Sequence, residues 1–278
     1  MTLWIFIYTI NTDGEYRMFL FKNMVKCAAI ALLFLSTQAK ADLSDILSKG
    51  VVKIAVPESF APFGSVGSSG KHEGYDVDVA KLIAKDLGVK LEIVPVVSKQ
   101  RIPFLETDRV DLVVSSMGAN PKRAKSINFS SAYAPFYSGA FAASKLEISE
   151  AKDLKGLKVG VTGGTLEDLE ITKMVPRGTN IVRFGDNAAT YSAFKSGQVQ
   201  VLVSGNTAAA QLAKNNPTLD IKRKFIIKDS PCFIGVKKGN DDLLRWVNVF
   251  VLHKKLGGAL NKISQKWLGQ DLPPLPAL

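Results

Sequence analysis

The stretch GYDVDVAKLIA, residues Gly74–Ala84, combines a turn with the start of an amphipathic helix. Gly74 permits a tight turn, and the carboxylates of Asp76 and Asp78 suit a first helical turn, where they face free backbone N–H groups. The apolar residues that follow recur at helical spacing. The stretch therefore predicts a loop that leads into a helix over 76–87, with one face buried.

Short apolar runs alternate with helix-period stretches along most of the chain. The predicted strands are 51–56, 91–97, 111–115, 157–161, 181–184 and 199–204, and the predicted helices are 102–106, 165–174, 188–196, 207–214, 241–255 and 259–267. Strands separated by helices of this length imply mostly parallel sheets flanked by helices, which is an α/β architecture.

Two further extended runs, 133–145 and 231–237, indicate how the chain is divided. A chain that leaves one lobe by the first run and returns by the second forms two lobes joined by two hinge strands, with a cleft suited to a ligand. We expect residues 42–136 and 233–278 to form lobe 1, and residues 137–232 to form lobe 2.

The first 41 residues have the pattern of a secretory signal peptide. Lys22 and Lys26 precede nine apolar residues, 27–35. Ala39 and Ala41 are the small residues at positions −3 and −1 of the cleavage site. Nine helical residues rise about 1.5 Å each and do not span about 30 Å of hydrocarbon. We therefore expect cleavage before residue 42 and a periplasmic protein.

The start of translation is a separate question. Met18 and Met24 would each make a more ordinary start than Met1. An untranslated extension over 1–17 is a hypothesis that N-terminal sequencing of the precursor tests.

Composition excludes several classes of protein. The 278 residues carry 36 basic and 25 acidic side chains, and the chain from residue 42 keeps 237 residues and a charge of +9. The basic residues are dispersed and no groove-reading motif is present, so nucleic acid is not an expected partner. No Cys/His cluster has metal-ligand spacing, so neither a metal nor a cofactor is expected. Cys232, the one cysteine left after cleavage, is expected to be a buried, inert thiol.

The stretch Gly74–Ala84 resembles the signature of the family 3 extracellular solute-binding proteins, the polar amino-acid-binding components of ABC importers. The resemblance covers nearly all of residues 43–273 and includes SFAPF at 59–63, RIP at 101–103, NFS at 128–130 and GLKVGVTGGT at 156–165. It implies the two-lobed periplasmic-binding-protein fold and a small carboxylate-bearing ligand, which we expect to be an amino acid. It also implies a membrane ABC permease as partner, and we expect a monomer.

The resemblance carries roles to particular residues. Arg123 matches the arginine that clamps the ligand's α-carboxylate, and a guanidinium fork fits a planar carboxylate. Without the match, a solvated arginine in a first helical turn would be the simpler interpretation. Ser116 and Gly118 match positions that contact the ligand, although they also suit an ordinary turn after a strand. Gly164 and Thr165 match the contribution of the second lobe.

Thr165 is also a plausible helix N-cap, with Asp168 three residues on. Phe60 matches an aromatic residue that stacks on the ligand, and a core phenylalanine is the alternative. Ser98 and Arg101 resemble the pair that acidic-amino-acid binders use for the side-chain carboxylate, which favours glutamate or aspartate. No second arginine stands near 58–60, which opposes that specificity.

One position departs from the family. Family members usually carry an aspartate where Gly205 stands, and that carboxylate pairs with the ligand's α-ammonium. Losing such a partner commonly costs about 1.5–3 kcal/mol. Either Asn206, Glu58 or another acid substitutes, or the ligand is not an ordinary α-amino acid. Glu58 is otherwise interpreted as a solvated loop residue.

Two other functions remain as alternatives. Cyclohexadienyl or arogenate dehydratases share the fold, and Glu58 and Glu167 are candidate acids for such an enzyme. No supported acid–base pair appears, so we expect no catalytic residue and no enzyme. A ligand-sensing domain of a receptor or a wall-cleaving enzyme is disfavoured, since only 269–278 follow the last predicted helix.

Overall fold

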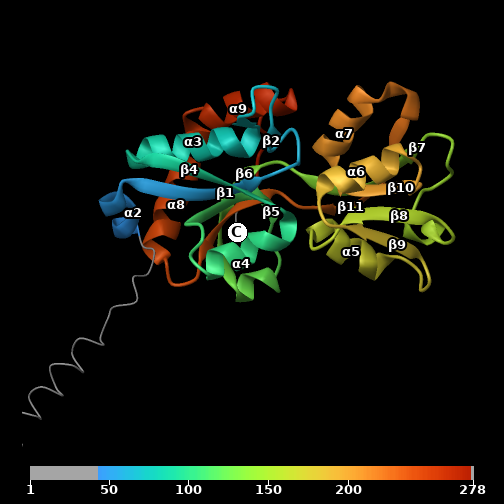
Figure 1. Ribbon diagram of the computed structural model, residues 1–278, viewed down its shortest axis with the longest axis horizontal. Coiled ribbons are helices and arrows are strands. Elements are labelled where there is room, and N and C mark those ends of the chain that lie inside the picture. Colours follow the sequence, from blue (N-terminus) through green and yellow to red (C-terminus); the bar gives the residue numbers. More distant parts are fainter. Residues whose placement is uncertain (1–42, 277–278) are drawn as a thin grey trace, which may run out of the picture. The chain divides into compact units, whose positions relative to one another are not determined.

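Two five-stranded sheets form the framework of the protein (Figure 1). The computed structural model describes residues 43–276, so the predicted signal peptide over 1–41 lies outside the described residues. The first sheet has the order β4-β1-β5-β12-β6 and consists of β1 (Val51–Pro57), β4 (Lys90–Val96), β5 (Leu112–Gly118), β6 (Ile127–Ala134) and β12 (Cys232–Lys237). The second has the order β11-β7-β10-β8-β9 and consists of β7 (Tyr137–Ala143), β8 (Lys158–Thr162), β9 (Asn180–Phe184), β10 (Val201–Gly205) and β11 (Ile221–Asp229).

Most strands of each sheet run in one direction. In the first sheet β1 pairs in parallel with β4 and β5, and β12 is antiparallel to both of its neighbours. In the second sheet β8 pairs in parallel with β9 and β10, and β7 is antiparallel to both of its neighbours. The chain passes from β6 to β7 and returns from β11 to β12, so it connects the two sheets twice.

Helices cover both faces of each sheet. The first sheet packs with α3 (Tyr75–Leu87), α4 (Arg101–Glu106), α8 (Asp241–Leu256) and α9 (Ala259–Leu268), and the second with α5 (Leu166–Met174), α6 (Asn187–Lys195) and α7 (Asn206–Asn215) (Figure 1). The short elements are α2 (Leu43–Lys49), β2 (Ser65–Val66), β3 (His72–Glu73), and the 3₁₀ turns η1 (Ser98–Gln100), η2 (Arg123–Lys125), η3 (Ala151–Leu154) and η4 (Pro217–Leu219). None of the described helices is long and apolar enough to cross a bilayer.

Alternating side chains of the strands feed separate cores. Ile54 and Val56 of β1 join the cluster that includes α3, α8 and α9, whereas Ala55 joins Leu105 of α4 on the opposite face. In the second sheet Val203 packs with Ile171 of α5. This two-residue alternation with both faces buried explains why the strands read as nearly continuous apolar runs.

The turn before α3 requires glycine, as the sequence predicts. Gly74 has a φ of 136°, and a Cβ there would lie 2.3 Å from the carbonyl oxygen of Phe63. The helix begins at Tyr75, one residue before the predicted start, and ends at Leu87. The close approach fixes the loop that precedes the helix against the segment containing Phe63.

Among the described strands, β11 and the two-residue β2 and β3 have no counterpart among the predicted elements, and β6 is matched only at its end. All of the predicted strands and helices within residues 43–276 are present, and most of their ends differ from the predicted ones by one or two residues. The predicted run over 133–145 is divided in the structure, because its first residues belong to β6 and its later residues form β7. Cys232 is buried and forms no disulfide with any described residue, and burial raises the pKa of its thiol well above the usual range, in agreement with an inert thiol.

Candidate functional site

A pocket lies where segments from the two sheets approach each other. About 330 Å³ of space free of protein atoms, open solvent included, lies at this pocket. Its lining residues are Phe60, Ser98, Arg101, Ser116, Phe136, Thr162, Thr165, Glu167, Asn187, Val203 and Ser204. Ser116 lies near the carboxyl end of β5, Thr162 at that of β8 and Ser204 at that of β10. Carboxyl ends of parallel strands are the usual place for ligand sites in α/β folds.

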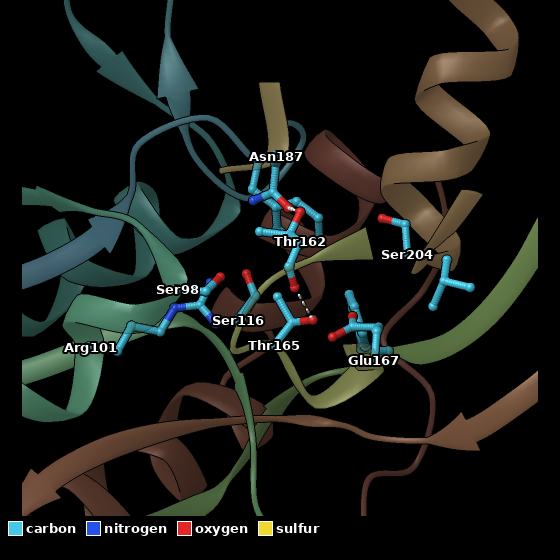
Figure 2. A pocket seen from close by; sticks show the side chains of 11 residues that line it. Ser98, Arg101, Ser116, Thr162, Thr165, Glu167, Asn187 and Ser204 are labelled. Atoms are coloured by element: carbon cyan, nitrogen blue, oxygen red, sulfur yellow. Dashed lines mark hydrogen bonds between the residues drawn. The ribbon is translucent and has the colours of Figure 1, made fainter. Parts of the chain in front are cut away.

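Arg101, the first residue of α4, reaches the pocket from the side of the first sheet. Its side chain is buried, and its Nε donates a hydrogen bond to Ser115 Oγ at 3.0 Å. Burial lowers the pKa of this guanidinium, and the nearby carboxylates of Glu167 and Asp76 oppose that shift. Figure 2 shows Arg101 and Glu167 on opposite sides of the pocket, with Ser116 and Thr165 between them.

Arg123, at the start of η2, bonds to Gly118, the last residue of β5, and to Gly164, which follows β8. Its Nη1 donates to the carbonyl oxygen of Gly118 at 2.7 Å, and its Nη2 donates to that of Gly164 at 3.0 Å. Burial and the positive charge of Arg101 together lower the pKa of Arg123 to about 10, although the carboxylate of Glu167 acts in the opposite direction. Arg123 lines a second, adjoining cavity with Ser98, Lys99, Arg101, Ile102, Met117 and Gly164.

The two cavities share Ser98 and Arg101. Two buried guanidinium groups therefore face neighbouring parts of one region. Each keeps a charge that water no longer solvates well, and an anion placed there gains charge-assisted hydrogen bonds. The arrangement favours a ligand that carries at least one carboxylate.

Thr165 caps helix α5, as the sequence predicts. Its Oγ1 accepts a hydrogen bond from the backbone N–H of Asp168 at 3.1 Å and donates to the carbonyl oxygen of Thr162 at 2.9 Å. Asp168 returns toward the preceding turn, where its carboxylate accepts from the N–H of Gly164 at 3.1 Å. This reciprocal cap holds the loop after β8 in place and presents Thr165 to the pocket.

Ser116 is held by a buried polar network. It has a φ of 45°, its Oγ donates to Asp76 Oδ2 at 2.6 Å, and its N–H donates to Tyr133 Oη at 3.1 Å. Tyr133 Oη in turn donates to Asp76 Oδ1 at 2.6 Å. Burial raises the pKa of Asp76 to about 7, although both hydrogen bonds and the charge of Arg101 act in the opposite direction. Asp76 therefore fixes Ser116 at the pocket, in addition to occupying the first turn of α3.

Phe60 lies at the pocket within an aromatic group. Its ring centroid is 5.6 Å from that of Phe63 and 6.2 Å from that of Phe136. It is also part of the buried core of the first sheet, so the core and pocket interpretations of Phe60 hold together.

The sequence of this chain matches a known protein family over most of its length. The sequence profile described as bacterial extracellular solute-binding proteins, family 3, matches residues 52–270. The chain belongs to this family.

Relatives within family 3 bind amino acids. The L-cystine-binding protein TcyJ of Escherichia coli K12 is 29% identical over 253 residues, which cover 88% of this chain and 94% of TcyJ. A solved L-cysteine receptor of Neisseria gonorrhoeae superposes with a TM-score of 0.77 at 31% identity, covering 82% of this chain and 93% of the receptor. An ancestral amino-acid-binding protein, described as a precursor of cyclohexadienyl dehydratase, gives a TM-score of 0.75 at 29% identity, covering 81% of this chain and 98% of the ancestral protein.

These similarities confirm the predicted fold class of a family 3 protein. The structure has two sheets flanked by helices, and the superposed proteins share that architecture over most of their length. The predicted lobe boundaries remain a prediction.

Most of the predicted site residues of this family 3 chain lie together. Phe60, Ser98, Arg101, Ser116 and Thr165 line the pocket, and Arg123 and Gly164 line the adjoining cavity. Gly118 supplies the carbonyl oxygen that holds Arg123, and a Cβ at Gly118 would lie 2.2 Å from Ser230 Oγ.

Two predicted residues lie elsewhere. Glu58 is exposed, and its backbone N–H donates to Val96 at 3.2 Å. Asn206 begins α7, and its Oδ1 accepts from the backbone N–H of Tyr137 at 3.1 Å, so that oxygen is already engaged. Asn206 lines a different cavity, together with Tyr137 and Trp267.

Sequence reasoning did not identify several pocket residues. These are Thr162, Asn187, Val203 and Ser204. Thr162 ends β8, Ser204 lies next to the end of β10 and Asn187 follows β9, so the carboxyl ends of parallel strands were the available signal for these three. Glu167 was considered only as a candidate acid of an enzyme. Phe136 carries no local signal, because its position depends on how the connection between β6 and β7 packs.

Proposed function

We propose that this chain is the binding protein of an ABC importer and captures an amino acid between two lobes. The proposal keeps the predicted division of lobe 1 (42–136 and 233–278) from lobe 2 (137–232). It also keeps the periplasm as the location, a cleaved signal peptide, a membrane permease as partner and a monomeric state.

The observation that carries the proposal is the origin of the pocket residues. Arg101 and Ser116 come from segments of the first sheet, and Thr165 and Glu167 from segments of the second. A ligand in the pocket touches both sets at once. Its binding energy therefore favours the arrangement in which the two sets lie close together, which is how a two-lobed protein closes on a solute.

Arg123 is the proposed partner of the ligand's carboxylate. It is buried, and its guanidinium bridges Gly118 and Gly164, so its fork is already oriented between the two segments. Arg101, with Ser98 beside it, is the proposed partner of a second polar or anionic group. The Oγ of Ser98 is buried and has no partner among the described residues, so it is free to bond a ligand.

The direct test is identification of the bound solute. The chain from residue 42 is purified from a periplasmic extract without refolding, denatured, and the released small molecules are identified by mass spectrometry. Thermal unfolding is then followed with the twenty amino acids, L-cystine and a set of organic acids. A raised unfolding temperature with at least one amino acid supports the proposal, because a ligand that binds only the folded state stabilises it. No shift with any amino acid contradicts it.

An enzyme of the dehydratase type is the second candidate. The likeness to an ancestral protein described as a precursor of cyclohexadienyl dehydratase favours it, as does a buried carboxyl group, Glu167, in the pocket. Incubation with prephenate and with arogenate decides between the two. If neither substrate yields a product, the dehydratase hypothesis is rejected.

A further inference from the structure

Glu167 is an acid of the pocket whose charge has no ion-pair partner in the described part of the chain. It lies in the first turn of α5, is only 8% exposed and lines the pocket. No hydrogen bond or ion pair to its carboxylate is found among residues 43–276, although its charge is felt by Arg101 and Arg123 and favours their charged forms. Neither guanidinium lies within ion-pair distance of it.

The neighbouring acids of the same helix behave differently. Asp168 forms an ion pair with Arg183 at 2.7 Å, and Glu170 pairs with Lys173 at 3.0 Å and with Lys228 at 3.8 Å. A carboxylate withdrawn from water costs free energy unless a cation or donors compensate it. Asp168 and Glu170 each have a cationic partner within the described protein. Glu167 has none, and its carboxylate faces the pocket, where a ligand could supply one.

No other acid of the described pocket is available for a cationic group. Glu167 is the sole carboxylate among the lining residues of the two adjoining cavities. The carboxylate of Asp76 lies behind Ser116 and accepts hydrogen bonds from Ser116 and Tyr133, so both of its oxygens are occupied. At the end of β10, the space beside Gly205 is filled by the ring of Phe136.

We propose that Glu167 binds the cationic group of the ligand and thereby selects α-amino acids over plain carboxylic acids. The inference rests on the proposed function and deepens it. The guanidinium groups of Arg101 and Arg123 receive the ligand's negative charge, and Glu167 receives its positive charge from the opposite side. The separation of the two charges across the pocket matches a zwitterion, and a ligand with a carboxylate alone leaves Glu167 uncompensated.

The test compares matched ligands with and without the amino group. Binding by isothermal titration calorimetry is measured for L-glutamate and glutarate, L-cysteine and 3-mercaptopropionate, and L-alanine and propionate, with wild type, Glu167→Gln and Glu170→Gln. Glutamine keeps the volume of residue 167 and removes its charge. Glu170→Gln is the control, since it removes a charge from the same helix away from the pocket.

We expect Glu167→Gln to weaken the best-bound amino acid at least tenfold and to leave the matching deaminated acid unchanged or more tightly bound. A residue with a merely structural role would weaken both members of a pair. Glu167→Ala, checked for folding by its cooperative thermal transition, should change selectivity in the same direction. Unchanged affinity of Glu167→Gln for the amino acid, or wild-type affinities equal within a pair, overturns the role of Glu167. Failure of the wild type to bind any amino acid overturns the proposed function itself.

Discussion

The ring of Phe136 occupies the space that a side chain at Gly205 would need. A Cβ on Gly205 would lie 2.1 Å from Phe136 Cζ and 2.2 Å from Cε2. Phe136 belongs to the connection between β6 and β7, and Gly205 is the last residue of β10. The contact therefore packs the connection between the two sheets against the end of a strand of the second sheet. The usual aspartate of the family cannot be accommodated there while the ring keeps its place.

Gly205→Ala should therefore destabilise the fold by more than about 2 kcal/mol, because the clash involves a ring that is itself buried. The free energy of unfolding is measured by urea titration. Gly185→Ala is the matched control, since a Cβ at Gly185 meets nothing within 4 Å. Phe136→Ala combined with Gly205→Ala should cost less than the sum of the single changes. Additive costs would show that the two positions do not compete for space.

Arg123→Lys should lose binding of amino acids nearly as fully as Arg123→Ala. A lysine keeps the charge but not the two parallel donors that now reach the carbonyl oxygens of Gly118 and Gly164. We expect at least about a 100-fold loss in affinity, since each charge-assisted hydrogen bond contributes about 1.5–3 kcal/mol. Calorimetry measures it, with the exposed Arg177→Lys as control. Wild-type affinity in Arg123→Lys would remove the clamp role.

The buried carboxyl of Asp76 should make the stability of the protein depend on pH. Its pKa is raised from 3.8 to about 7 on folding, so between these values the folded state binds more protons than the unfolded state. Stability falls as the pH rises through this window, by at most about 1.4 kcal/mol per pH unit from this group, and the penalty is constant above it.

Asp76→Asn should flatten that dependence. Unfolding temperatures of wild type and Asp76→Asn are measured from pH 4 to pH 8. The wild-type value minus the variant value should decrease most between pH 4 and pH 7. Asp229→Asn, at an exposed position, serves as the control. Parallel curves for wild type and Asp76→Asn would contradict the buried titration.

Processing at the N-terminus gives a prediction from the sequence alone. The exported protein should begin at Asp42, because Ala39 and Ala41 are small enough for the cleavage site. Ala41→Tyr should leave the precursor uncleaved, and Lys40→Ala, at the position between them, should not. Intact mass and N-terminal sequencing distinguish the outcomes.

Local sequence patterns were sufficient for much of the fold. β1 and β5 could be predicted because both of their faces are buried, which gives nearly continuous apolar runs in the sequence. The turn at Gly74 could be predicted because a close backbone contact allows no side chain there. β11 was missed for the opposite reason. It pairs only with β7, at the edge of its sheet, and its sequence IKRKFIIKD includes exposed lysines that blur the alternation.

The candidate site was predictable where a family motif marks it and not where tertiary packing decides. Arg101, Ser116 and Thr165 lie at strand ends or helix starts, which the pattern locates. The engagement of Asn206 by the backbone of Tyr137 depends on a partner distant in sequence. The same is true of the bond between Asp76 and Ser116, forty residues apart, which no helical spacing reveals.

The hydrogen bonds of Arg123 to Gly118 and Gly164 have a consequence for recognition. In the proposed role of Arg123, a solute carboxylate that replaces these two carbonyl oxygens exchanges neutral acceptors for charged ones. Affinity then reflects the difference between a charged acceptor and a neutral one, about a factor of two in hydrogen-bond strength. A solute with only neutral acceptors gains nothing by this exchange, so the proposed role of Arg123 implies selection for a negatively charged group whatever the rest of the solute.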